Sequence, residues 1–290
     1  MSNPDWMDWL ETATEQTSTS PETPAQVLPI RRPARPRAIT LPPATLVVGA
    51  CGGAGATTTA LGLANTVALA RGNAVAIDAT AGGGDIADRG AEFEPSVTSL
   101  EMLLADGTVR DDVFAGANSP TSVGAGVLHQ SGEHAGYLNF PVLDAYLREQ
   151  GTVGVYDAGP HLRSSHIRPF WSLGDRAAAP IVLTVPCRAD AFNRMRYSLS
   201  TIAELLMHEQ RLISTVVVIS HQRPDVATDD VAVLRDYLEH RVSAVLDVPY
   251  DDILAIGGWI DHRALRPDTV AAYDSLTAAV VAAADASVQR

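Results

Sequence analysis

Lysine is absent from the chain, since all 21 of its basic residues are arginine. Any ligand contact or reaction that needs a lysine from this chain is therefore excluded, in whatever register its motifs are aligned. Cysteine is scarce as well: Cys51 and Cys187 are too few for a disulfide framework and do not form a Cys-x-x-Cys metal pair. This cysteine usage is typical of a protein that works in a reducing cytoplasm.

Positive charge and long apolar runs are also lacking. The 34 acidic residues outweigh the 21 basic ones and give a formal net charge of −13 at pH 7, which argues against autonomous binding to nucleic acid. No apolar run reaches the roughly 18 residues that a transmembrane helix needs. The polar, acidic start does not have the pattern of a secretory signal peptide. We therefore expect a cytoplasmic chain without a transmembrane segment, which a partner can recruit to a membrane or pole.

Residues 1–43 differ in composition from the rest of the chain. The stretch "TSTSPETPAQVLPIRRPARPRAITLPP" is rich in proline and lacks apolar periodicity, which predicts a disordered linker. Before it, "NPDWMDWLETA" predicts a short helix that places Trp6, Trp9 and Leu10 on one face. A helix this short is not stable alone. The tail is therefore either a docking peptide for a protein partner or a tail that packs on its own domain.

From residue 44 onward, short apolar segments alternate with helical patterns. The segments predict strands at 45–49, 74–78, 126–129, 153–157, 181–185, 215–220 and 244–248, and helices at 57–71, 140–150, 189–209, 231–241 and 269–287. Apolar strands separated by helices form parallel sheets that are covered on both faces. Residues 44–290 are therefore predicted to form one α/β domain, doubly wound around a mostly parallel sheet of about seven strands.

The stretch "VVGACGGAGATTTALGLA", residues 47–64, has the layout of a phosphate-binding loop. An apolar strand enters a glycine-rich turn, and a helix rich in Ala and Leu follows. The backbone N–H groups of such a turn and the dipole of the helix together attract anions. Gly52, Gly53 and Gly55 allow the backbone to approach a phosphate, and the hydroxyl of Thr57 can reach a magnesium ion.

This loop resembles the deviant Walker A motif of the ParA/MinD family, K-G-G-x-G-K-[ST]-T. Residues 51–58 read "CGGAGATT", so the three glycines match, as do Thr57 and Thr58. Cys51 stands at the signature lysine of the family, and Ala56 stands at its P-loop lysine. The "GGAGA[ST]" form is similar to the septum-site and pilus-assembly (CpaE-like) branch of actinobacteria.

The resemblance continues to about residue 288. "NAVAIDATAGGGDIADRG" resembles the second strand of the family, with Asp78 at the first aspartate of an Asp-x-Asp segment and Thr80 at the second, which helps to position water. "VGVYDAGP" resembles the Walker B strand, with Asp157 on the magnesium side. The resemblance implies a P-loop NTPase fold and face-to-face dimers over ATP. The nucleotide-binding positions that it implies are Gly52, Gly53, Gly55, Thr57, Thr58, Asp78 and Asp157, with Thr57 and Asp157 on magnesium.

Three functional positions of the family are thus altered in one site, at Cys51, Ala56 and Thr80. Because a charged contact to phosphate contributes roughly 1.5–3 kcal/mol, each missing lysine is predicted to weaken nucleotide binding about 10- to 100-fold. We expect a degenerate ParA/MinD-like protein without catalytic residues and with weak or no ATP binding. Its expected role is localisation or assembly in cell division, plasmid maintenance, conjugation, pilus or secretion machinery.

Two alternatives stay open on the sequence. One is an active but atypical ATPase in which Arg163, Arg188 or an arginine of a partner replaces the lysines. The other is a dinucleotide-binding protein similar to short-chain dehydrogenases, because residues 49–55 also fit G-x-x-x-G-x-G and Asp78 could then bind a ribose. Members of that class resemble one another in a Tyr-x-x-x-Lys pair as well, and a chain without lysine cannot form this pair.

Overall fold

The computed structural model describes residues 44–132, 138–165, 167–171, 179–206, 212, 214–224 and 229–288. The predicted tail, residues 1–43 with Trp6, Trp9 and Leu10, lies outside the described residues. All described residues fall within the unit Arg37–Arg290. Among them, no helix is both long enough and apolar enough to cross a lipid bilayer.

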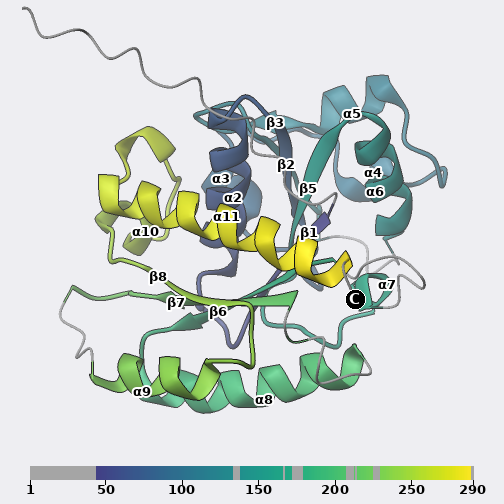
Figure 1. Ribbon diagram of the computed structural model, residues 1–290. Coiled ribbons are helices and arrows are strands. Elements are labelled where there is room, and N and C mark those ends of the chain that lie inside the picture. Colours follow the sequence, from purple (N-terminus) through teal and green to yellow (C-terminus); the bar gives the residue numbers. More distant parts are fainter. Residues whose placement is uncertain are drawn as a thin grey trace, which may run out of the picture. The chain divides into compact units, whose positions relative to one another are not determined.

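The strands of the described residues form one sheet in the order β3-β4-β2-β5-β1-β6-β7-β8 (Figure 1). Every neighbouring pair is parallel except β3 with β4. The seven predicted strands are all present at nearly the predicted positions. Their bounds are β1 Ala44–Gly49, β2 Asn73–Asp78, β4 Gly126–Leu128, β5 Thr152–Asp157, β6 Ile181–Pro186, β7 Thr215–Ser220 and β8 Ala244–Val248.

The edge strand β3, Ser119–Pro120, is an eighth strand that the sequence does not predict. It has two residues and pairs antiparallel with β4. A segment of this length is too short to carry apolar alternation, and its proline suits only an edge position. The prediction of about seven strands was therefore short by this edge strand, while the doubly wound, mostly parallel sheet is confirmed.

The five predicted helices are present as α2 Ala56–Leu69, α6 Phe140–Glu149, α8 Ala189–Leu205, α9 Asp229–Leu238 and α11 Pro267–Val288. The predicted end of α8, at 207–209, lies outside the described residues. The shorter helices were not predicted, because three to seven residues hold too little of a helical period. They are α3 Ile86–Gly90, α4 Leu100–Leu103, α5 Asp111–Ala117, α7 Arg168–Trp171, α10 Asp252–Ala255 and a 3₁₀ turn at His262–Ala264.

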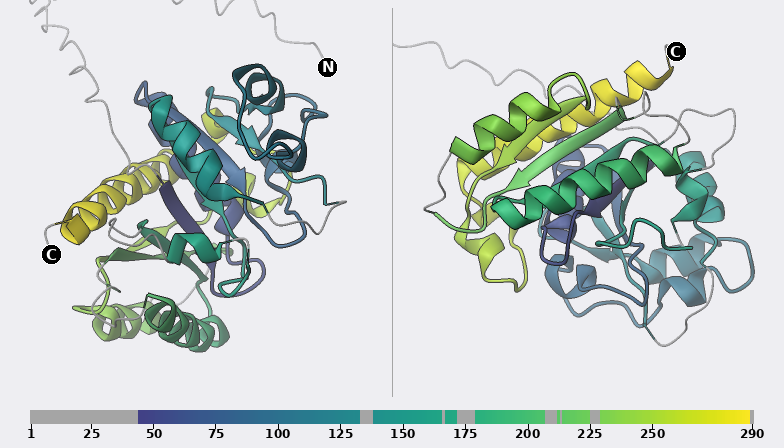
Figure 2. Two further views of the ribbon diagram at one scale, coloured as in Figure 1. Left: turned by 90° about the vertical axis from the view of Figure 1, so that its right-hand side faces the viewer. Right: turned by 90° about the horizontal axis from the view of Figure 1, so that it is seen from below.

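Helices cover both faces of the sheet. Side chains of β1 alternate between two buried apolar clusters, with Leu46 and Val48 in one and Val47 in the other. Residues of α6, α8 and α9 belong to the first cluster, and residues of α2 and α11 belong to the second. Figures 1 and 2 accordingly show α8 and α11 on opposite sides of strands β6–β8. Every central strand is therefore buried on both faces, as its continuous apolar sequence predicts.

Strand pairing sets the position of the site. The parallel register pairs Val47 of β1 with Asp157 of β5, and Asp157 with Asp78 of β2. The carboxyl ends of these strands therefore meet at one edge of the sheet, where β1 enters the glycine-rich loop. Open α/β sheets bind their ligands at this edge.

Candidate functional site

The loop between β1 and α2 has the glycine conformations that a phosphate cradle requires. Gly53 has φ 70° and Gly55, which precedes the first helical residue, has φ 88°. The N–H of Ala54 donates to the carbonyl of Cys51 at 3.2 Å and closes the turn. A Cβ added at Gly52 or Gly53 would meet no atom within 4 Å, so this side of the loop faces open space.

The two threonines of the motif have different partners. The hydroxyl of Thr58 donates to the carbonyl of Gly55 at 2.8 Å, within the first turn of α2. The hydroxyl of Thr57 donates to Asp85 Oδ1 at 3.2 Å, and it lies close enough to Asp157 to favour the charged form of that carboxyl. Thr57 therefore faces the carboxylates of the site, whereas Thr58 caps the turn beneath it.

Asp157 is buried beside the loop at the end of β5. Its Oδ1 accepts a hydrogen bond from the N–H of Gly159 at 3.0 Å. Burial raises the pKa of the Asp157 carboxyl to about 6. The hydrogen bonds from Thr57 and Gly159 oppose this shift, and the negative charges of Asp78 and Asp85 add to it. Among the described residues, no cation compensates this carboxylate.

Asp78 is buried at the end of β2, and both of its carboxylate oxygens accept hydrogen bonds from the backbone. The N–H of Gly84 donates at 2.7 Å and the N–H of Thr80 donates at 3.0 Å. Burial is the main cause that raises the pKa of Asp78 above its ordinary value. Gln130 supports the same turn, because its amide donates to the carbonyls of Asp78 and Thr80 at 3.0 and 2.8 Å. Asp78 thus holds the loop that follows β2.

Thr80, at the position of the second aspartate, has a partner in the sheet. Its hydroxyl donates to the backbone carbonyl of Asp157 at 3.3 Å. A Cβ added at Gly159 would lie 3.1 Å from the Thr80 methyl group. A hydroxyl in this place contributes no negative charge and accepts a proton poorly, so Thr80 cannot replace an aspartate that positions water.

The structure argues against the dinucleotide-binding alternative. In that fold the strand that bears the acidic residue lies next to the strand that enters the glycine loop. Here β5 lies between β1 and β2. The oxygens of Asp78 are also occupied by backbone N–H groups, so they are not presented to a ribose.

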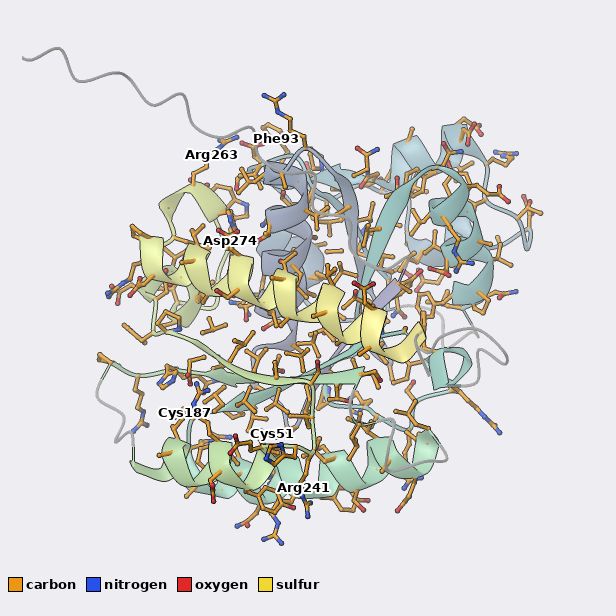
Figure 3. The ribbon with its side chains drawn as sticks, viewed as in Figure 1. Cys51, Phe93, Cys187, Arg241, Arg263 and Asp274 are labelled. Atoms are coloured by element: carbon orange, nitrogen blue, oxygen red, sulfur yellow. The ribbon has the colours of Figure 1, made fainter. Side chains whose placement is uncertain are left out.

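Small, buried side chains occupy both lysine positions. Cys51 belongs to the apolar cluster that includes residues of α8, and Figure 3 shows it on that side of the sheet. Ala56, the first residue of α2, belongs to the opposite cluster. Arg188, which precedes α8, brings its Nη2 to 3.8 Å from Cys51 Sγ. This contact places an arginine beside the first of the two lysine positions.

Three residues that contact this site were not found from the sequence. Asp85 precedes α3 and binds Thr57; an acidic residue after three glycines and before a helix was the signal for it. Gln222 follows β7 and donates its amide to the carbonyl of Gly53. Ser220 would lie 3.2 Å from a Cβ at Gly55. Neither Gln222 nor Ser220 belongs to a local motif, so only the folded sheet brings them to the loop.

The site fits a magnesium nucleotide only in part. The backbone cradle remains, and Thr57 and Asp157 offer oxygens to a divalent cation. Among the described residues, no group of three or more His, Cys, Asp or Glu side chains can hold a metal ion by itself. Magnesium commonly combines one or two carboxylates with phosphate oxygens, so the two residues would bind it together with phosphate. The cationic half of such a site, which lysines supply, is missing.

Comparisons with known proteins agree with this architecture. No protein-family model and no curated protein matches the sequence. Solved structures that resemble the chain include the MinD cell-division ATPase of Pyrococcus furiosus, at 14% identity and TM-score 0.57, over 81% of this chain and 97% of that one. Apo McdA of Cyanothece matches at 18% identity and TM-score 0.54, over 81% and 98% of the two chains.

A third similar structure contains ligands. Cobyrinic acid a,c-diamide synthase from Mycobacterium smegmatis, solved with ADP and magnesium, matches at 18% identity and TM-score 0.55, over 81% of this chain and 92% of that one. At these identities the likeness concerns the fold. The chain has the P-loop fold of the ParA/MinD-type ATPases, as the sequence motifs predict.

Proposed function

We propose that this protein is a degenerate member of the ParA/MinD family that acts as a localisation or assembly factor and does not hydrolyse ATP. Relatives in fold include a cell-division ATPase and a plasmid partition protein, which supports a role in positioning cellular components. The form of the loop favours the septum-site and pilus-assembly branch. The proposed location is the cytoplasm, with homodimerisation or a protein partner bringing the chain to its place of action.

One observation carries this proposal: carboxylates surround Thr57 and no lysine accompanies them. The negative charges of Asp78 and Asp85 are close enough to Asp157 that both add to the rise of its pKa, which burial mainly causes. A nucleotide triphosphate would add negative charge to this site. In nucleotide hydrolases the charge supplied to the transition state is worth about 10³–10⁵ in rate. The site therefore lacks the groups that accelerate hydrolysis, while its backbone cradle retains a weak affinity for phosphate.

Purified protein is expected to release no phosphate from ATP above the level of the Asp157→Ala variant, in the presence of magnesium. The variant removes the carboxylate on the proposed magnesium side, so any release that persists in it comes from a contaminant. The measurement is steady-state phosphate release at saturating ATP. Magnesium-dependent release that Asp157→Ala abolishes would show that the protein is an ATPase.

The position of Arg188 supports the second candidate function, an atypical ATPase in which an arginine replaces the lysines. The Arg188 guanidinium lies beside Cys51 and also pairs with Asp190 at 3.2 Å, so it is a candidate to contact a phosphate in the loop. If phosphate release is found, Arg188→Ala should abolish it. Arg196→Ala in the following helix α8 is the matched control, since the Arg196 guanidinium lies over the ring of Tyr237, 5.4 Å from its centroid. This pattern would favour the atypical ATPase.

The tail is proposed to supply the contact with a protein partner through Trp6, Trp9 and Leu10. Large aromatic side chains dominate the energy of many interfaces. A flexible linker would keep a bound partner at a local concentration of up to about millimolar. Recruitment of this kind needs no hydrolysis, which agrees with the proposed role.

Deletion of residues 1–20 is expected to change Tm by less than about 2 °C, because a docking peptide contributes nothing to the stability of the domain. The same deletion, and the double variant Trp6→Ala/Trp9→Ala, should remove partners that co-purify from native lysate. Differential scanning fluorimetry and quantitative co-purification measure the two effects. A deletion that lowers Tm by several degrees and retains every partner would show that the tail packs on its own domain.

A further inference from the structure

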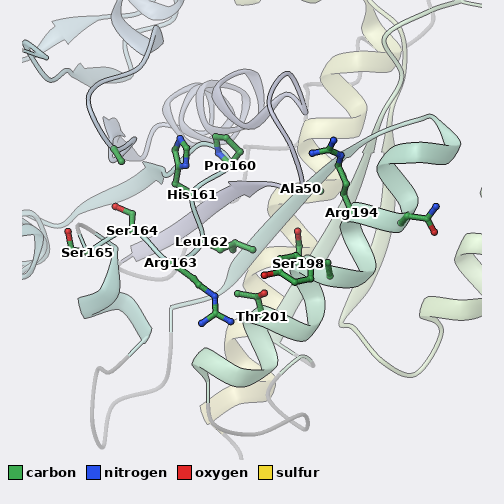
Figure 4. Close-up of a pocket in the computed structure, with 13 residues that line it drawn as sticks. Ala50, Pro160, His161, Leu162, Arg163, Ser164, Ser165, Arg194, Ser198 and Thr201 are labelled. Atoms are coloured by element: carbon green, nitrogen blue, oxygen red, sulfur yellow. The ribbon is translucent and has the colours of Figure 1, made fainter.

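A separate pocket lies beside the phosphate loop, between α8 and the loop that follows β5 (Figure 4). Its volume is about 810 Å³, which is typical of small-molecule sites. Ala50, at the start of the phosphate loop, lines one edge. Pro160 and Leu162 line the pocket with apolar surface, and the polar groups come from the segment 161–165 and from α8.

The charge of the pocket is opposite to that of the chain. Arg163, Arg194 and His161 line it, and none of its described lining residues is acidic, although the chain has a net charge of −13. The Arg163 guanidinium is already used, because it forms an ion pair with Glu204 at 2.5 Å. Arg194 is exposed, and it forms no ion pair in the described part of the chain. Among the two arginines that line the described pocket, Arg194 is therefore the one available to a ligand.

Two residues with hydroxyl groups line the same pocket. Ser198 and Thr201 are three residues apart on α8 and are only 3% and 2% exposed. Neither hydroxyl has a hydrogen-bond partner among the residues that the structure describes. Ser198 and Thr201 thus offer hydrogen bonds to an oxygen that enters the pocket.

We infer that this pocket binds a small, multiply charged oxyanion, a molecule that bears phosphate or carboxylate groups. The planar guanidinium of Arg194 matches the geometry of either group. The hydroxyls of Ser198 and Thr201 donate to its remaining oxygens. The ligand belongs to the pocket and not to the glycine cradle, so the inference stands independently of the proposed function of the phosphate loop.

Isothermal titration calorimetry of the full chain at low ionic strength tests the inference, with inorganic pyrophosphate and citrate as probes. Arg194→Ala should weaken binding of the probe about 10- to 100-fold, since one charge-assisted hydrogen-bond donor pair is lost. Arg196→Ala makes the same change of charge two residues away on the same helix and should leave binding unchanged. Binding of pyrophosphate alone identifies a phosphate-bearing ligand, and binding of citrate alone identifies a carboxylate-bearing one.

A second variant separates the pocket from the cradle. Gly53→Asp places a carboxylate at the open side of the phosphate loop, at a positive φ that aspartate tolerates better than most residues. The pocket should bind the probe equally well in this variant. Binding that Gly53→Asp removes and Arg194→Ala retains would assign the anion to the loop and overturn the inference. An equal loss of probe affinity in Arg194→Ala and Arg196→Ala would also overturn the inference. So would the absence of binding heat from either probe with the wild-type protein.

Discussion

Asp157→Asn is expected to raise the free energy of unfolding by roughly 2–3 kcal/mol at pH 7.5, in the presence of a chelator. Burial raises the pKa of the Asp157 carboxyl to about 6, so the folded protein carries an unfavourable buried charge above that pH. Asparagine has nearly the same shape. Its carbonyl oxygen can accept the hydrogen bond from Gly159, and its amide can donate to the hydroxyl of Thr57.

The pH dependence of this effect has a defined direction. The folded-state pKa of Asp157 lies above the ordinary value of 3.8, so the folded state holds the proton more tightly than the unfolded state. The charge of Asp157 therefore lowers the free energy of unfolding by its full amount above about pH 6. This destabilisation disappears as the pH falls towards 3.8. Asp78, whose pKa is also raised by burial, acts in the same direction. The gap between wild type and Asp157→Asn should narrow between pH 6 and pH 4.

Urea unfolding across this pH range measures the effect, and Asp144→Asn is its matched control. Asp144 is also a buried aspartate, but it is paired with Arg148 one turn along α6. Removing its charge leaves the guanidinium without its partner, so Asp144→Asn should lower stability at pH 7.5. A loss of stability in Asp157→Asn at that pH would show that a cation compensates the carboxylate of Asp157.

Apolar patterning was sufficient to predict the layers of this fold. The strands β1, β5, β6 and β7 are continuous apolar runs, because helices cover them on both faces. Such runs are long enough to be recognised without knowledge of their neighbours. The edge strand β3 and the helices of four to seven residues are held by local turns and packing, so no periodic signal reveals them.

The site was predictable where it follows a local motif. Gly53, Gly55 and Thr57 lie within five consecutive residues of the loop and the start of α2, and their spacing carries the information. Asp85, Gln222 and Arg188 reach the same loop from the ends of other strands, up to 169 residues away in sequence in the case of Gln222 and Gly53. Strand order, and not sequence distance, decides which of these side chains meet. The pocket beside α8 was missed for the same reason.

A lysine introduced at the first residue of α2 tests whether the loop is arranged to bind phosphate. Ala56→Lys is expected to tighten binding of Mg·ADP and Mg·ATP about 10- to 100-fold, because a charged contact to phosphate contributes roughly 1.5–3 kcal/mol. The new ammonium group would also add positive charge one residue from Thr57, whose hydroxyl donates to Asp85, and would so reduce the repulsion of a polyphosphate. The wild-type protein is expected to bind either nucleotide no more tightly than the high micromolar range. Isothermal titration calorimetry measures both proteins directly.

Leu69→Lys is the matched control for this change. Leu69 is exposed at the last residue of the same helix, about 20 Å from Ala56 at 1.5 Å per residue. It adds the same charge to the same helix, so its effect on affinity reports only the long-range field of the protein, which salt screens over this distance. Nucleotide binding that is equal in Ala56→Lys and Leu69→Lys would show that the loop is not arranged around phosphate. A sub-micromolar affinity in the wild type would instead show that another group, with Arg188 beside Cys51 the first to test, already replaces the lysines.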